Sequence, residues 1–135
     1  MKTLVLSIKR KFFDEIVEGT KKKEYREVRP TVFKKYGRIV VPFPGGTEYQ
    51  SWDEVPEDLL NSGWGITPVK YDALKLLTGE YKGKRPYIII EVVNSDIYLL
   101  TDENGNDIVI GEGTDNEYLA TEICYELGNI IEKSF

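Results

Sequence analysis

Apolar and polar residues follow helix and strand periods along the early part of the chain. Thr3–Ile8 is β-branched and aliphatic, as is typical of a buried strand. Residues 9–18 repeat apolar side chains at helical spacing, and Gly19 follows where a left-handed cap ends a helix. Lys22–Arg29 is polar, has no helical period and stops at Pro30. The pattern therefore predicts strand, helix and strand, with these residues on the apolar side of the helix: Ile8, Phe12, Phe13, Ile16 and Val17.

The remainder of the chain favours strands. A helical turn is expected at Thr31–Tyr36 and a strand at Gly37–Val41. Pro42–Gly65 resembles a long connection with one short helix near Pro56–Asn61, and its residues Trp52 and Trp64 would anchor it to the core or stack on bases. Further strands are predicted at Tyr71–Leu77, Tyr87–Val93, Ile97–Leu100, Ile108–Ile110 and Glu122–Leu127, the last ending at Gly128.

Length and composition limit the fold. The chain has 135 residues, of which 41% are hydrophobic, so it can bury a core as a single domain over residues 1–135. Many short strands with few helices predict the α+β class, as a small mixed β-barrel of five or six strands with two or three short helices. Asn104-Gly105 within Asp102–Asp107 favours a hairpin over a calcium loop, because the ligand spacing of a calcium loop is missing.

Two scarce residue types exclude several kinds of chemistry. The sequence contains no histidine, which rules out imidazole bases, imidazole metal ligands and a Ser-His-Asp triad. Cys124 is the sole cysteine, so neither an internal disulfide nor a zinc cluster is possible. The apolar stretch near Met1 is too short for a signal peptide, and no run reaches membrane-spanning length. We therefore expect a cytoplasmic protein with no membrane partner, metal or cofactor.

Charge is distributed unevenly along the chain. Residues 1–40 hold 12 Lys and Arg against 5 Asp and Glu, a net charge of +7, whereas residues 41–135 hold 6 against 18, a net charge of -12. If the basic residues share one face, they could attract a polyanion although the whole chain has a net charge of -5. Equally, the lysines could simply solvate a helix and a strand.

Three polar residues after the predicted helix form a candidate site. Glu24 and Arg26 are two apart on a predicted strand, so they project from one face with Cα atoms about 7 Å apart. A carboxylate can accept hydrogen bonds from the amines of a base, and a guanidinium can bind a phosphate or carbonyl. Lys21 could add a third polar group. The alternative is an exposed ion pair that contributes at most about 1 kcal/mol.

The pattern Gly19-x-Lys21-x-x-Glu24-x-Arg26 resembles the motif of the ASCH domain, a member of the PUA-like superfamily. It follows a strand ending Leu6-Ser7-Ile8-Lys9 and an amphipathic helix, and the resemblance covers about the first 30 residues. The resemblance implies a PUA-like barrel whose cleft is bordered by the motif, and a role with RNA, nucleotides or modified nucleosides. A basic surface would surround this cleft.

A small branch of that family hydrolyses the acyl amide of N4-acetylcytidine. This branch uses the motif lysine, a threonine where this chain has Glu24, and an acid from a distant loop. Lys21 matches, whereas Glu24 departs from that pattern, and no motif selects the acid among Asp53, Glu54 and Glu57. In the hydrolase interpretation Lys21 and Glu24 would be catalytic, and Ser7 or Thr20 would polarise an oxyanion.

We therefore carry three hypotheses from the sequence. The first is a module that binds RNA or a nucleotide or nucleoside, and the second is the amidohydrolase. The third is a protein-interaction domain that works through its acidic second part. In the first hypothesis the ligand-binding residues comprise a pocket set and a surrounding basic set. They are Ser7, Lys9, Lys21, Glu24 and Arg26 in the pocket, with Lys11, Lys22, Lys23 and Arg29 around it.

Overall fold

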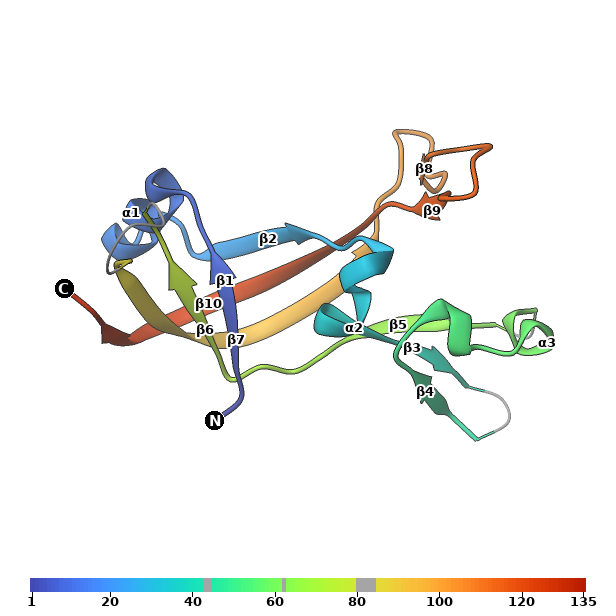
Figure 1. Cartoon of the computed structure of the whole chain (residues 1–135), viewed down its shortest axis with the longest axis horizontal. Helices are drawn as coiled ribbons and strands as arrows, with labels where there is room; N and C mark the ends of the chain where they lie inside the picture. Colours follow the sequence, from blue (N-terminus) through green and yellow to red (C-terminus); the bar gives the residue numbers. More distant parts are fainter. Residues whose placement is uncertain (43–44, 62, 80–84) are drawn as a thin grey trace. The chain divides into compact units, whose positions relative to one another are not determined.

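The computed structural model describes residues 1–42, 45–61, 63–79 and 85–135. It has the α+β architecture predicted from the sequence, with a mixed sheet and a few short helices (Figure 1). The chain divides into two compact units, each assembled from separate segments. The first unit comprises Met1–Glu24, Lys70–Ser95 and Tyr125–Phe135, and the second comprises Tyr25–Val69 and Asp96–Cys124.

The largest sheet has five strands. They are β1 (Thr3–Ser7), β2 (Lys23–Glu27), β6 (Ala73–Leu77), β7 (Tyr87–Leu99) and β10 (Thr121–Lys133). Their order across the sheet is β1-β6-β7-β10-β2. β1 runs parallel to β6, with Val5 opposite Lys75, and β6 runs antiparallel to β7. A strand near the start of the chain is therefore held at the sheet edge by residues about seventy positions later.

The first unit is held together by one buried face of these strands and by helix α1 (Arg10–Glu18). Leu6 and Leu76 are buried on the strands, and the helix buries Phe13 and Ile16. The prediction that Phe12 is buried with them is wrong, because its side chain is 38% exposed. The same holds for Val17, at 36%. In this nine-residue helix the buried side chains are a single pair spaced i, i+3, namely Phe13 and Ile16.

In the second unit a smaller antiparallel sheet joins three strands. They are β3 (Gly37–Val41), β4 (Thr47–Tyr49) and β5 (Gly65–Pro68), in the order β4-β3-β5. Before it lie a 3-10 turn (Pro30–Val32) and α2 (Phe33–Tyr36), at the predicted helical turn. The short helix predicted near Pro56–Asn61 is confirmed as α3 (Glu57–Leu60). The rest of the predicted connection also contains β4, a 3-10 turn (Trp52–Glu54) and the first residue of β5.

The two tryptophans of this stretch anchor it. The Trp52 ring lies 6.2 Å from that of buried Phe33 and 4.7 Å, edge to face, from that of Trp64. The alternative that these rings anchor the connection to the core is therefore supported. None of the helices in the part of the chain that the structure describes is long and apolar enough to cross a bilayer.

Two predicted strand ends are wrong. Ile97–Leu100 does not begin a new strand, because β7 continues from Tyr87 to Leu99. β10 does not stop at Gly128 but continues to Lys133. The hairpin at Asn104-Gly105 is confirmed, since Thr101 bridges Asp107 and Gly105 has a φ of 80°. The strand predicted at Ile108–Ile110 is confirmed as β8 (Val109–Ile110), and it pairs with a further short strand, β9 (Tyr118–Leu119).

Candidate functional site

The turn between α1 and β2 is fixed at both ends. Gly19 has a φ of 84° and donates its N–H to the carbonyl of Ile16 at 3.1 Å, as the predicted left-handed cap requires. The N–H of Lys21 donates to the carbonyl of Glu15 at 3.1 Å. The carbonyl of Lys22 accepts the N–H of Leu127 at 2.9 Å. Lys21 is thus attached to the end of the helix, and Lys22 to strand β10.

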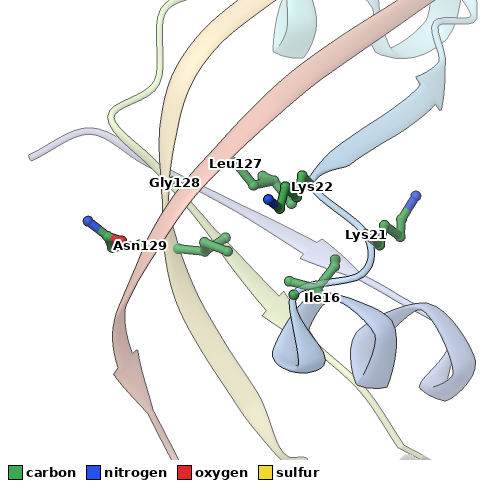
Figure 2. Close-up of a pocket in the computed structure, with 8 residues that line it drawn as sticks. Ile16, Lys21, Lys22, Leu127, Gly128 and Asn129 are labelled. Carbon is green, nitrogen blue, oxygen red and sulfur yellow. The ribbon is translucent and has the colours of Figure 1, made fainter.

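A pocket of about 300 Å³ opens beside this turn, within the first unit (Figure 2). Such a volume is at the lower limit for small-molecule sites. Its lining is apolar at Ile16, Ile90 and Leu127, lacks side chains at Gly19 and Gly128, and is polar at Lys21, Lys22 and Asn129. The three apolar side chains are buried, so the pocket offers a small apolar surface with polar groups around it.

Gly128 allows a contact between the pocket wall and the neighbouring strand. Glu91 Oε1 accepts the backbone N–H of Asn129 at 2.9 Å. A Cβ at position 128 would lie 2.8 Å from Val93 Cγ1 and 3.2 Å from Glu91 Cβ. The side chains of β7 therefore occupy the space that a side chain at position 128 would need. Glycine inside a strand often marks such a close approach, and this is the signal by which the sequence could have located the wall.

The lysines after the helix have different surroundings. Lys21 is half-buried, and its Nζ lies 5.3 Å from the centroid of the Phe12 ring. Figure 2 shows this ammonium directed away from the other lining side chains, whereas the side chain of Lys22 lies beside Leu127. Lys23 forms an exposed ion pair with Glu126 at 3.9 Å. Of the predicted site residues, Lys21 and Lys22 are the two that line the pocket.

Glu24 and Arg26 lie on β2 with different burial. Glu24 is 6% exposed and belongs to the first unit, whereas Arg26 is half-buried and belongs to the second. Between and beside them, Lys23, Tyr25 and Glu27 are exposed, so alternation puts Glu24 and Arg26 on the more buried side of the strand. Neither lines the pocket beside α1.

The other predicted residues lie outside the pocket. Ser7 is exposed, and its hydroxyl accepts a hydrogen bond from Arg85 at 3.2 Å, a contact that sequence reasoning missed. Lys9 precedes α1, and Lys11 lies on its first turn, both exposed. Arg29 lies 3.4 Å from the Glu27 carboxylate, and this side-chain hydrogen bond raises the pKa of Arg29 above its ordinary value.

The charge asymmetry of the sequence also separates the two units. The first unit contains 13 Lys and Arg against 9 Asp and Glu, a net charge of +4. The second contains 5 against 14, a net charge of -9. The pocket therefore belongs to the part of the chain that attracts anions.

The site holds no apparent metal centre: within residues 1–42, 45–61, 63–79 and 85–135, no group of three or more acidic or cysteine residues could hold an ion. Comparisons with models of known protein families, with curated proteins and with solved structures found no match. The arrangement of the pocket and its lysines is therefore the basis for a functional proposal.

Proposed function

We propose that this chain is an ASCH-type module of the PUA-like class that binds nucleotides, either free or within RNA. The motif residues support this proposal by their local setting. They follow a strand, a helix and a left-handed glycine cap, and Glu24 is buried in the next strand. This is the order of elements that the resemblance implies.

The observation that carries the proposal is the pocket beside α1. Its buried surface of Ile16, Ile90 and Leu127 suits the flat, weakly polar face of a base or the carbon side of a sugar. Lys22 on its wall suits an anionic group attached to that body. A small apolar surface with an ammonium group beside it matches the two parts of a nucleotide.

Binding should be measured with a fluorescently labelled single-stranded RNA and, by calorimetry, with free nucleoside monophosphates. If one lysine neutralises a phosphate of a single strand, a fourfold rise in salt should weaken RNA binding by about threefold. Exchanging Lys22 for methionine should remove most of this salt dependence.

The matched control is Lys34→Met, because Lys34 is an exposed lysine of the acidic second unit. It should leave RNA binding nearly unchanged. Absence of binding to any RNA or nucleotide, or binding that ignores salt, would contradict the proposal. Binding to free nucleotides but not to RNA would assign the pocket to the free ligand.

The amidohydrolase is the second candidate from the resemblance, and the pocket does not favour it. A catalytic lysine must reach the acyl group, whereas the ammonium of Lys21 lies against the ring of Phe12. We expect no cytidine when the pure protein is incubated with N4-acetylcytidine and the mixture is separated by chromatography. Release that disappears in Lys21→Ala would instead establish the enzyme.

A further inference from the structure

We infer that Lys22, rather than the motif lysine Lys21, holds the phosphate of the nucleotide in this pocket. The inference rests on the proposed function and makes it more specific. It assigns the ligand class as a nucleoside carrying a phosphate monoester, whether a free monophosphate or the phosphorylated end of an RNA.

The backbone directs these two consecutive lysines to different places. The N–H of Lys21 is bound to Glu15 at the end of the helix, and the carbonyl of Lys22 is bound to Leu127 on β10. Successive side chains of an extended segment point to opposite sides. The side chain of Lys22 accordingly lies beside Leu127 in Figure 2, and that of Lys21 extends the other way.

The ammonium groups of Lys21 and Lys22 also differ in the side chains that they contact. Lys21 Nζ lies over the Phe12 ring, 5.3 Å from its centroid, and this ring is not part of the pocket lining. Among the described residues, no carboxylate forms an ion pair with Lys22, whereas the next lysine, Lys23, pairs with Glu126. The charge of Lys22 is thus not balanced by an acidic side chain among the described residues.

The rest of the pocket limits what this ammonium could hold. Beside it lies the apolar surface that includes Leu127, while the Lys22 side chain itself is exposed to solvent. Glu91, bound to the N–H of Asn129 on the same wall, adds a negative charge nearby. One lysine and a volume of about 300 Å³ therefore suit one phosphate on one nucleoside better than a polyphosphate chain.

The test compares nucleosides with their 5′-monophosphates by calorimetry, for the adenine and cytosine pairs. The wild-type protein should bind the monophosphates about twofold to fivefold more tightly, the range expected for an ion pair made by an exposed lysine. Lys22→Met keeps the length of the side chain but removes the charge, and should abolish this preference. Lys21→Met, its neighbour and matched control, should retain it.

A reversed result, in which Lys21→Met loses the preference and Lys22→Met keeps it, would overturn the inference. Equal affinity of the wild type for nucleosides and monophosphates would overturn it while leaving the proposed function intact. Absence of binding to nucleosides, monophosphates and RNA would overturn both. Circular dichroism of each variant should match the wild type, because both lysine side chains reach solvent. Should Lys22→Met unfold, Lys22→Gln takes its place.

The two sources of the phosphate are separated by competition. A short RNA with a 5′-phosphate and the same RNA with a 5′-hydroxyl should be compared against a bound fluorescent monophosphate. Displacement by the phosphorylated RNA alone assigns the pocket to RNA ends, and displacement by neither assigns it to the free nucleotide. Displacement by both RNAs equally would show that an end phosphate is not what Lys22 holds, and would overturn the inference.

Discussion

Replacing Gly128 by alanine places a methyl group where β7 leaves no room for it. The new carbon would lie 2.8 Å from Val93 Cγ1, 3.2 Å from Glu91 Cβ and 3.3 Å from Glu91 Oε1. Valine has few alternative rotamers, and Glu91 Cβ is tied to the backbone, so the strands themselves must shift. Overpacking of this kind costs about 1–3 kcal/mol. Displacing Glu91 from the N–H of Asn129 would add about 1 kcal/mol.

The free energy of unfolding should be measured by urea denaturation for four proteins: the wild type, Gly128→Ala, Val93→Ala and the double variant. Val93 is 63% exposed, so its truncation alone should cost little, but it removes the closest contact. The double variant should therefore be more stable than the sum of the single changes predicts.

Gly65→Ala is the control for the loss of a glycine. Position 65 lies in β5 with no atom within 4 Å of an added Cβ and no left-handed φ. Alanine there should be neutral or slightly stabilising. A Gly128→Ala protein as stable as the wild type, or single effects that simply add in the double variant, would refute the steric account of this position.

Substitutions at three further positions test other parts of the fold. Thr78 has a fully buried hydroxyl with no hydrogen-bond partner among the described residues, so Thr78→Val should stabilise the protein by about 1 kcal/mol in urea denaturation; destabilisation would contradict this. Burial, and then the hydrogen bond that Tyr98 donates to Glu122 at 2.5 Å, raise the pKa of Tyr98 above its ordinary value of 10.0. Above pH 10 the unfolded chain loses this proton while the folded state keeps it, so the free energy of unfolding should fall as the pH rises. In Tyr98→Phe this fall should be less steep, by up to about 1.4 kcal/mol per pH unit. Equal slopes in the two proteins would contradict the prediction. Trp52→Ala should cost about 3 kcal/mol through lost contacts such as that with Trp64, and Trp52→Phe clearly less; similar losses would mean that the ring contacts contribute little.

Local signals in the sequence were sufficient for the elements that depend on local physics. Helix α1 and its end at Gly19 were predictable because periodicity and the left-handed cap both act within a few residues. The boundaries of β3 were also predicted, since Gly37 and Pro42 limit a β-branched run. The exposure of Phe12 was not predictable, because it depends on how wide a face the sheet presents to the helix.

The errors arise where pairing between strands, rather than a local pattern, decides the structure. A glycine within β10 was taken for the end of the strand, although the sheet partners of β10 carry the strand through Gly128. Three-residue β4 has too little pattern to be detected, and its pairing with β3 stabilises it. The different positions of Lys21 and Lys22 were not predictable either, because the carbonyl of Lys22 accepts a hydrogen bond from Leu127, about a hundred residues later. The pocket was missed for the same reason, since strand order brings Ile90 and Leu127 together.

The alternation of the two units along the chain constrains how the protein can be made. Any contiguous fragment that contains one whole unit also contains residues of the other. The first unit includes both Met1–Glu24 and Tyr125–Phe135, and the second includes residues on either side of Lys70–Ser95. On the ribosome, β1 emerges before β6 and must wait for it before this edge is paired. Native structure in the first unit therefore cannot be completed until translation has released Tyr125–Phe135.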